Sequence, residues 1–374
     1  MSIERENTQF KHSKKVKKPA WRKVLIIVLA VLLCILIGLG GFVGYNVVKL
    51  LGGFQSEEVT DPDIVDVETI DKEIVNIALF GIDTREGEAA FSGNSDSIMI
   101  LSVNTKTGSI KLMSVMRDSY LPIVKDIDEN GEPVTYNYKV NAAYANGGPE
   151  RAIKTLNHNF GLDIKNYATV NFQGMAEIID AIGGIDVEVR RAEIYANNGL
   201  NQNIREQCDL VGLSANDYLV HKAGVQTLNG IQAVAWARIR SVATTDGVNN
   251  DHGRTDRQRY VMEQILNKVL EISPSEYSEL AKVIMPHVKT SLSAKEALKL
   301  AMSVLTKKIS FSQTRVPHKE YTITDNATTN AGSSVYYDPD DAKAVIHAYI
   351  YENIEPEVFL ETYTPEKKDW ANIR

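Results

Sequence analysis

The longest apolar stretch of the chain runs from Val24 to Val48 and contains no charged residue. A helix needs roughly 20 apolar residues to cross a bilayer, and this stretch is longer. A buried helix of a soluble protein is rarely apolar on every side over so many turns. A cleaved signal peptide is the other alternative, but the apolar run is too long and no small-x-small cleavage site follows Lys49. The pattern therefore predicts a retained N-terminal transmembrane helix at residues 24–48.

Beyond residue 73 the pattern changes to short apolar runs and helical periodicity. Ile74–Asp83 has the composition of a buried strand that ends in Gly and Asp. Ser97–Val103 and Ile110–Val115 predict a hairpin, because the turn-forming segment Asn104–Ser109 separates them. Helices and strands then alternate without an internal repeat. We therefore expect an α/β (α+β) fold with a central mixed β-sheet flanked by helices.

The remaining elements are predicted from short apolar runs, which indicate strands, and from apolar residues at helical spacing, which indicate helices. Further strands are expected at Tyr167–Phe172, Ile185–Val189 and, as a final strand pair, Thr314–Pro317 with Ser334–Tyr337. Helices are expected to begin at Pro149 and to cover Gly174–Ile182, Gly230–Ala237, Arg254–Ile272, Glu276–Met285, Ala294–Val304 and Pro339–Tyr351. The polar stretch 191–225 predicts irregular structure, and residues 354–374 predict a loose polar tail.

Charge is distributed unevenly along the chain. Residues 1–23 carry eight Lys and Arg against two Glu, a net of +6, so a total of −7 leaves −13 for the other 351 residues. A basic flank fixes that side of a membrane span in the cytoplasm. We therefore expect a single-pass cell-membrane protein with a cytoplasmic segment at 1–23, an acidic spacer at 49–73 and an extracytoplasmic domain at 74–353. The acidic bulk argues against nucleic acid as a partner.

The sequence lacks the motifs of P-loop NTPases, serine hydrolases and zinc enzymes. It contains no phosphate-binding Walker loop, no Gly-x-Ser-x-Gly elbow and no His-Glu-x-x-His, and its seven histidines are scattered. Its two cysteines, Cys34 within the apolar stretch and Cys208, supply neither a disulfide framework nor a cysteine metal site. Chemistry must therefore be sought among carboxylates and cations.

Two aspartates flank the first two predicted strands. Asp83 follows the first strand, and Asp96 lies at the entry to the second. If these strands are neighbours, the two carboxylates approach each other, and a hard cation between them would relieve their repulsion. Mg²⁺, with Mn²⁺ as a substitute, suits oxygen ligands and substrate phosphates. The alternative is two independent turn aspartates.

Cations gather at strand ends and at one predicted helix start. Arg238 and Arg240 lie on one side of an extended segment, and Arg254, Arg257 and Gln258 share a face of the first turn of a long helix. Arginines at a helix N-terminus oppose its dipole unless an anion binds there. A phosphate group is the anion that we favour.

Other placements of the cations stay open. Arg117 closes the predicted hairpin and Lys139 follows it, and each is compatible with a solvated sheet edge. The arginines near residue 254 could instead pair with Asp251 and Asp256. Carboxylates suited to Mg²⁺ together with several arginines are nevertheless the groups that a diphosphate substrate requires. Outside the cell, where ATP is absent, a lipid-linked pyrophosphate is the more plausible donor.

In order along the chain, these clusters resemble the LytR-CpsA-Psr family of cell-envelope glycopolymer transferases. The matching segments, which include ARIR and GRTDRQ as the last two, are Asn76–Arg85, Ser95–Met99, Ser114–Tyr120, Lys139–Pro149, Val170–Gly174, Ile182–Val187, Leu228–Ala233, Ala237–Arg240 and Gly253–Gln258. The resemblance implies Mg-assisted transfer of an undecaprenyl-pyrophosphate-linked glycopolymer, such as wall teichoic acid or capsule, to peptidoglycan. It also implies an apolar tunnel for the prenyl tail.

The resemblance assigns roles residue by residue. It implies a metal site at Asp83 and Asp96, and catalytic roles for Asp83, Asp96, Arg117 and Arg240. The side chains that it implies for pyrophosphate binding are Arg85, Lys139, Arg238, Arg240, Arg254, Arg257 and Gln258. Asn94 departs from the family pattern, which has Arg directly before the Ser-Asp pair, and this lost charge is expected to affect polymer preference.

Two other functions remain as alternatives. One is a membrane-anchored envelope regulator or transcriptional attenuator, since family members often carry that label. No DNA-binding motif is present, and the 23 cytoplasmic residues are too few for a folded DNA reader. The other is a lipid pyrophosphatase, in which water replaces the sugar hydroxyl.

Overall fold

The computed structural model describes residues 56–83, 91, 93–271, 277–305, 307 and 310–365. The predicted cytoplasmic segment 1–23, the predicted transmembrane helix 24–48 and Arg85 lie outside these residues. Within the described part, none of the helices combines the length and the apolar character that crossing a bilayer requires.

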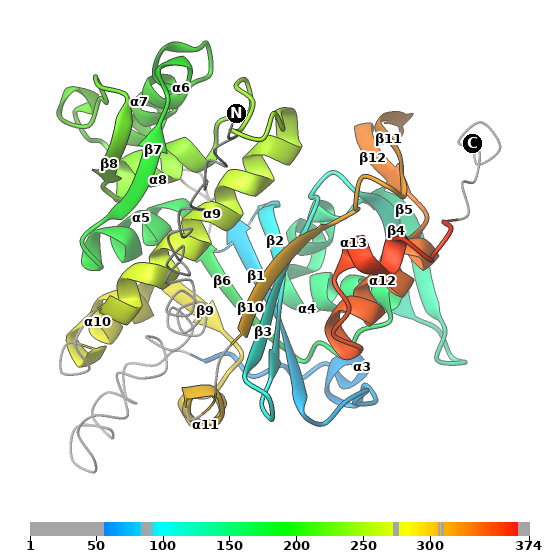
Figure 1. The fold of residues 1–374 in the computed structure, drawn as a ribbon. Helices are drawn as coiled ribbons and strands as arrows, with labels where there is room; N and C mark the ends of the chain where they lie inside the picture. The colour runs from blue at the N-terminus through cyan, green and yellow to red at the C-terminus, as the bar shows by residue number, and fades with distance from the viewer. Residues whose placement is uncertain are drawn as a thin grey trace, which may run out of the picture.

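Helices and strands alternate along the described chain, as Figure 1 shows. Their order is α3 (Pro62–Val65), β1 (Ile74–Ile82), β2 (Ser95–Asn104), β3 (Ser109–Val115), β4 (Tyr120–Ile127), β5 (Pro133–Lys139), α4 (Asn141–Phe160), β6 (Asn166–Asn171), α5 (Phe172–Ala181), β7 (Ile185–Val189), α6 (Arg191–Tyr195), α7 (Leu200–Leu210), η3 (Ala215–Asp217), β8 (Gly224–Leu228), α8 (Gly230–Ala237), α9 (Asn250–Glu271), α10 (Tyr277–Ile284), η4 (Met285–His287), β9 (Val288–Thr290), α11 (Ala294–Leu305), β10 (Ser310–Val316), β11 (Thr322–Thr329), β12 (Gly332–Tyr337), α12 (Pro339–Tyr351) and α13 (Pro356–Leu360).

A six-stranded mixed sheet forms the centre of the molecule, with the strand order β10-β3-β2-β1-β6-β9. Strand β1 is antiparallel to β2 and parallel to β6, and β10 is parallel to β3. The predicted central mixed sheet and the hairpin of β2 and β3 are confirmed. In the β1–β2 register Ile82 lies opposite Ser95, so the residues that follow and precede these strands meet at one end of the sheet.

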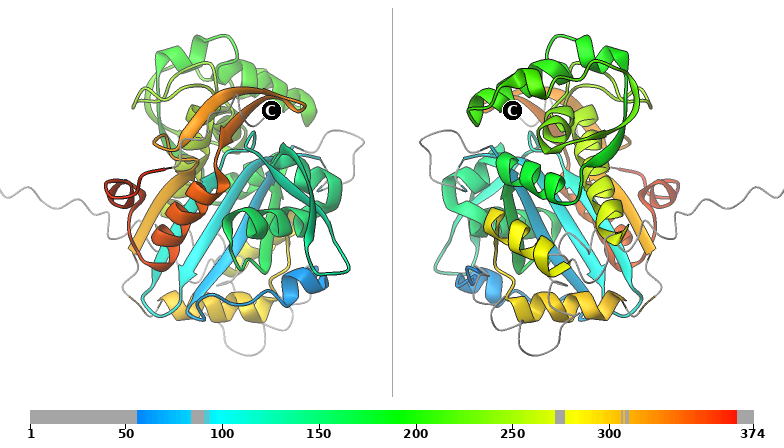
Figure 2. Two further views of the ribbon diagram at one scale, coloured as in Figure 1. Left: turned by 90° about the vertical axis from the view of Figure 1, so that its right-hand side faces the viewer. Right: turned by 90° about the vertical axis from the view of Figure 1, so that its left-hand side faces the viewer.

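Both faces of the sheet are covered, because alternate residues of its strands point to opposite sides. On β1, Ile77 packs into a cluster with residues of α5, α8 and α9. Ala78 and Phe80 pack into a second cluster with residues of α4 and α12. Figures 1 and 2 show these two helical layers on opposite sides of the sheet. Removing two apolar faces from water is the main source of stability for such an arrangement.

The stretch 191–225, predicted to be irregular, contains helices α6 and α7 and the short helix η3. On α7, Leu200, Ile204 and Cys208 recur every four residues and are fully buried against the cluster that contains Ile77. Only this narrow apolar stripe is present among polar residues, so the periodicity is easily overlooked. The prediction of irregular structure was wrong, and the consequence is a helical layer on one side of the functional site.

The predicted final strand pair was also wrong. Strand β10 pairs with β3 in the central sheet, and β12 pairs with β11 in a separate two-stranded ribbon. The hairpin of β4 and β5 was not predicted either, because β5 exposes most of its side chains and lacks an apolar face. Figure 1 shows the β11–β12 ribbon above the sheet, beside β4 and β5.

Residues on both sides of the predicted domain boundaries pack against the domain. Ile64 of α3 is fully buried, and Ser56 forms a bridge with Thr290 of β9. Residues 56–73 therefore belong to the folded domain and do not form a free spacer. Near the other end, residues 356–360 form α13, in which Pro356 is buried.

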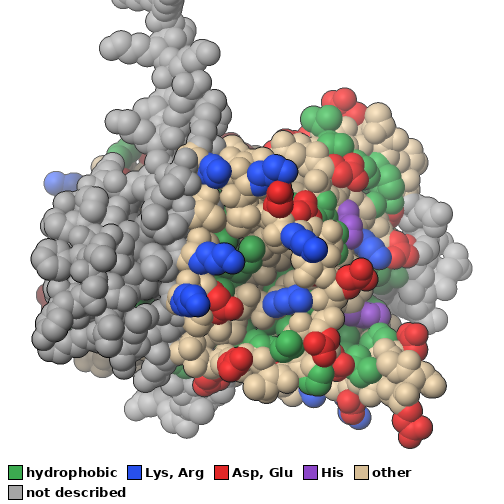
Figure 3. Space-filling model, turned by 90° about the horizontal axis from the view of Figure 1, so that it is seen from below, with side chains coloured by type: hydrophobic (Ala, Val, Ile, Leu, Met, Phe, Trp, Pro, Cys, Tyr) green, Lys and Arg blue, Asp and Glu red, His purple; other side chains and the backbone are tan. Residues whose placement is uncertain are grey.

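Charges of both signs cover the face that Figure 3 shows from below, at the opposite end of the sheet from the Asp83 end. Lys and Arg side chains gather in the middle of the described part of this face, with Asp and Glu among them and around them. In the turn between β2 and β3, Lys106 pairs with Glu73 at 3.0 Å. The described part of this face therefore presents no large surface of a single sign.

Candidate functional site

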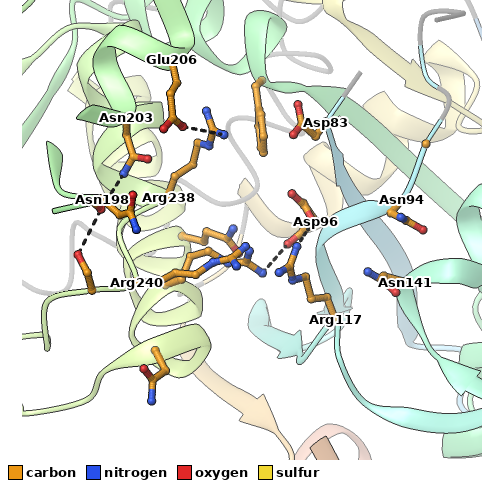
Figure 4. A pocket seen from close by; sticks show the side chains of 16 residues that line it. Asp83, Asn94, Asp96, Arg117, Asn141, Asn198, Asn203, Glu206, Arg238 and Arg240 are labelled. Atoms are coloured by element: carbon orange, nitrogen blue, oxygen red, sulfur yellow. Dashed lines mark hydrogen bonds and ion pairs between the residues drawn. The ribbon is translucent and has the colours of Figure 1, made fainter. Parts of the chain in front are cut away.

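A cavity of about 840 Å³ opens where β1 ends and β2 begins, beside α7, α8 and α9. Polar side chains line most of it, and Figure 4 shows them pointing into a shared space. The lining residues are Asp83, Gly93, Asn94, Asp96, Arg117, Asn141, Phe172, Asn198, Asn203, Glu206, Arg238, Arg240, Ser241, Asn250, Arg254 and Gln258. Seven residues predicted from the sequence, Asp83, Asp96, Arg117, Arg238, Arg240, Arg254 and Gln258, are thus brought together.

The two predicted metal-binding aspartates lie on the same side of the cavity (Figure 4). Asp83 follows β1 and Asp96 is the second residue of β2, so the antiparallel pairing of these strands brings them together. Burial by itself would raise the pKa of Asp96, but Arg117, Arg254 and Arg240 outweigh it and lower that pKa below its ordinary value. Asp96 therefore stays ionised at neutral pH, as a ligand of a cation must.

Metal binding depends on whether these donors suit a hard cation. Carboxylate oxygens do, but the described residues contain no group of three or more His, Cys, Asp or Glu that could hold an ion. Two carboxylates fit Mg²⁺ only as a partial site, with water and substrate phosphate oxygens completing its six ligands. Arg117 contacts one oxygen of Asp96, so a cation bound there would share that carboxylate with this guanidinium.

Three arginines that line the cavity, Arg117 beside Asp96 and Arg240 and Arg254 from the helical side, meet at Asp251. The Asp251 carboxylate lies 3.1 Å from Arg254, 3.5 Å from Arg240 and 3.7 Å from Arg117. Burial, followed by repulsion from Arg117, lowers the pKa of Arg240, whereas Asp96 and the other neighbouring carboxylates help to raise that of Arg117. Both remain charged at neutral pH. The sequence left open that the arginines near residue 254 pair with Asp251, and this pairing is observed. The same arginines also line the cavity.

The long helix α9 begins at Asn250, four residues before the predicted start at Arg254. Arg254 therefore lies in the second turn and not at the helix N-terminus, and its side chain is 3% exposed. Burial lowers the pKa of Arg254 to about 10, which still leaves the guanidinium charged. Its Nη2 lies 3.3 Å from the backbone oxygen of Asp96, so it connects α9 to β2.

Arg238, at the end of α8, lines another part of the cavity. Its guanidinium lies over the ring of Phe172 at 5.3 Å and donates a hydrogen bond of 3.3 Å to Gln207. Glu206 is 3.9 Å away and about half exposed, so it neutralises Arg238 only weakly. This guanidinium is therefore well placed to attract an anion.

Lys139 does not line the cavity. It forms an ion pair of 3.0 Å with Asp118, which in turn lies 3.5 Å from Arg117. The role of Lys139 in pyrophosphate binding stays a prediction. In this structure Lys139 reaches the site through Asp118, as a support for Arg117.

Arg257 was predicted to share a cavity-facing surface with Arg254, but it is buried on another side of α9. Its side chain is 1% exposed and forms an ion pair of 2.9 Å with buried Glu193. It also donates hydrogen bonds to the carbonyl oxygens of Ile239 and Val242, at 3.1 and 2.8 Å. The two hydrogen bonds hold the segment that follows α8, which carries Arg240, and the ion pair joins α9 to α6. Arg257 supports the site and does not face it.

A polar rim that sequence reasoning missed completes the cavity. Asn198, Asn203 and Glu206 come from α7 and the turn before it, within the stretch predicted to be irregular, and Ser241 follows Arg240. Asn198 accepts hydrogen bonds from Asn203 and Ser241, at 3.5 and 3.3 Å (Figure 4). The spacing of polar residues gave no signal, because neutral amides are common on any helix surface.

Comparisons with known proteins agree with this geometry. A family model described as the LytR_cpsA_psr family matches residues 53–348. A relative from Bacillus mycoides, named polyisoprenyl-teichoic acid–peptidoglycan teichoic acid transferase TagU, is 31% identical over 89% of this chain and 98% of its own length. Biofilm regulatory protein A of Streptococcus mutans is 28% identical over 84% of this chain and 72% of its own length.

The fold also occurs among solved structures. Protein gbs0355 from Streptococcus agalactiae superposes with a TM-score of 0.58 at 23% identity, over 78% of this chain and 91% of its own. At this identity the likeness concerns the fold alone. It agrees with a mixed sheet flanked by helices.

Proposed function

Because the chain belongs to the LytR_cpsA_psr family, we propose that it transfers a polyprenyl-pyrophosphate-linked glycopolymer, such as teichoic acid, to peptidoglycan. One observation carries this proposal. A single cavity gathers two aspartates and four arginines from segments far apart in the sequence, which is what a diphosphate ester requires. The teichoic acid transferase named above, which is similar over nearly its full length, supports the same reaction class.

Binding and charge neutralisation are the tasks of the cavity residues. Arg117, Arg240 and Arg254 would hold the two phosphates, and Arg238 would attract them from the rim. An acceptor hydroxyl of peptidoglycan then forms a bond to the sugar-linked phosphorus, while the bond from that phosphorus to the polyprenyl phosphate breaks. The hydroxyl proton passes to the departing polyprenyl phosphate, so the step balances. Negative charge grows on the phosphoryl oxygens during this step, and fixed guanidiniums stabilise it in a site with little water.

Asp83 and Asp96 are the residues that would hold Mg²⁺. When bound, the ion would neutralise phosphoryl oxygens as a Lewis acid. The ionised state of Asp96 supports this role. Mn²⁺, which also takes oxygen ligands, would be the substitute.

The amide-rich rim suits the sugar that is attached to the pyrophosphate. Asn198, Asn203 and Ser241 offer neutral donors and acceptors, which pair with hydroxyl groups without adding charge. Asn94, at the other side of the mouth, is exposed and stands where the family pattern has Arg. We infer that this mouth discriminates between glycopolymers.

Transfer from a synthetic lipid-pyrophosphate glycan to peptidoglycan oligomers tests the proposal. The wild type should form the phosphodiester-linked product, and Arg240→Ala should lower its rate by about 10²–10³ because an electrostatic donor is lost. Arg240→Lys should also be slow, since an ammonium lacks the bidentate fork. Release of the polymer only to water would instead identify a lipid pyrophosphatase. A wild type that binds the lipid without turnover would favour the envelope regulator.

We also propose that the domain lies outside the cell, held to the membrane by residues 24–48. The basic residues 1–23 favour a cytoplasmic N-terminus, and a lipid-linked substrate is reached from the membrane surface. Protease added to intact protoplasts should degrade the chain beyond residue 49 and leave a cytoplasmic control protein whole. A C-terminal domain that becomes sensitive only after lysis would contradict this topology.

Nucleic acid is not among the proposed partners. The described cavity pairs its arginines with Asp96 and Asp251, and the face in Figure 3 mixes both signs of charge. Counterion release from a duplex requires a continuous positive surface. Lipid-linked glycopolymer, peptidoglycan and the cytoplasmic membrane are the partners that the proposal names.

A further inference from the structure

Asp251 connects three arginines that come from three separate parts of the fold. Arg117 follows β3, Arg240 follows α8, and Arg254 belongs to α9, which also carries Asp251 in its first turn. The distances from Asp251 to the guanidinium nitrogens are 3.1 Å for Arg254, 3.5 Å for Arg240 and 3.7 Å for Arg117. One carboxylate is therefore shared by cations of the sheet and of the helical layer.

These arginines would repel one another without a shared anion. Arg117 and Arg240 both act, after burial, to lower the pKa of Arg254, and Asp251 opposes them. The Asp251 side chain is 18% exposed and does not line the cavity, whereas all three arginines do. Its carboxylate thus lies behind the guanidiniums, where it contacts them without contacting a ligand in the cavity.

We propose that Asp251 is a positioning residue that fixes Arg117, Arg240 and Arg254 at the spacing that the reacting pyrophosphate requires. The proposal rests on the proposed transferase function. A fixed carboxylate assembles the cations before the substrate arrives, so that little reorganisation is needed during the reaction. Its removal should therefore affect the rate of the bound complex more than the affinity for an anion.

Asp251→Asn tests this distinction, because it keeps the shape of the side chain and removes its charge. In the transfer assay its kcat should fall by about 10- to 100-fold, since small displacements of catalytic groups are costly. By calorimetry, it should bind inorganic pyrophosphate at least as tightly as the wild type, because the cluster gains one net positive charge. Unchanged kcat, or a pyrophosphate affinity lowered more than tenfold, would overturn the proposal.

Asp256→Asn is the matched control. Asp256 lies on the same helix and also faces two arginines, Arg259 at 2.5 Å and Arg315 at 3.8 Å, but it does not line the large cavity. Its kcat and pyrophosphate affinity should equal those of the wild type. A control that loses as much kcat as Asp251→Asn would show a general effect of altered charge on α9 and would overturn the assignment.

Asp251→Glu keeps the proposal testable if Asp251→Asn does not fold. It retains the charge one methylene further out, so its kcat should lie between those of the wild type and Asp251→Asn, at an unchanged melting temperature. A kcat equal to that of the wild type would contradict the need for exact placement. Pyrophosphate binding requires no turnover, so a wild type that binds it but transfers nothing would refute the transferase function, while the effect of Asp251→Asn on pyrophosphate affinity stays measurable.

Discussion

Replacing Asp96 by alanine is expected to lower the rate of glycopolymer transfer by at least about 10²–10³, the largest effect expected of a single carboxylate in the cavity. The variant would lose half of the partial Mg²⁺ site, and metal neutralisation of phosphoryl oxygens contributes several kcal/mol. It would also remove the carboxylate that contacts Arg117. Removal of Mg²⁺ by a chelator should have the same effect on the wild type, and added Mg²⁺ should restore activity.

The fold should survive this substitution. Asp96 is partly exposed, and Arg117 keeps Asp118 and Asp251 as partners. The melting temperature should therefore change little. Asp63→Ala is a suitable control, since Asp63 is exposed on α3, at the far end of the sheet (Figure 1), and pairs only loosely with Lys154 at 3.5 Å. Full activity in the presence of the chelator would remove the metal from the mechanism.

The sheet was predictable where its strands are apolar and close together in sequence. Ile77 and Ala78 send their side chains into two different clusters. A short apolar run that is bounded by turn-forming residues, such as the Gly and Asp at the end of Ile74–Asp83, indicates a buried strand. The pairing of β10 with β3 joins residues about two hundred positions apart, as Phe311 opposite Ile110 illustrates. No local pattern encodes such a partner, so the predicted pairing of the last strands was wrong.

The site was predictable where its residues lie at the ends of strands that are neighbours in the sheet. Asp83 and Asp96 flank neighbouring antiparallel strands, so their meeting follows from the hairpin-like order of the chain. The polar rim did not follow, because Asn203 gains its role only when α7 packs beside α8. Its neutral amide carries no chemical signal in the sequence.

Helical spacing alone was insufficient to assign the arginines of α9. At about 100° per residue, Arg257 lies roughly 60° to one side of Arg254, and Gln258 roughly 40° to the other. By this spacing all three share a face of the helix, yet only Arg254 and Gln258 line the cavity, and Arg257 is buried in the core. The decisive partner is Glu193, whose burial was not visible in the sequence.

Arg257→Leu is therefore expected to act on stability, with a loss of about 3–5 kcal/mol in the free energy of unfolding. Removing Arg257 takes away one of the two cations that face buried Glu193, so the charge of Glu193 is compensated only in part. Glu193 would keep only Arg190, at 2.8 Å, and the hydrogen bond from Trp236 at 3.3 Å, while the carbonyl of Ile239 would lose its donor. Denaturant unfolding of the variant and the wild type measures this difference.

Gln258, the residue next to Arg257, is expected to affect activity and not stability. Gln258 lines the cavity, so Gln258→Ala should reduce transfer while the free energy of unfolding changes by less than about 1 kcal/mol. Arg257→Leu should lose activity only in proportion to its unfolded fraction, or through displacement of the segment that carries Arg240. If Arg257→Leu were as stable as the wild type and bound pyrophosphate far more weakly, Arg257 would have to turn into the cavity when substrate binds, and its role as a support would be refuted.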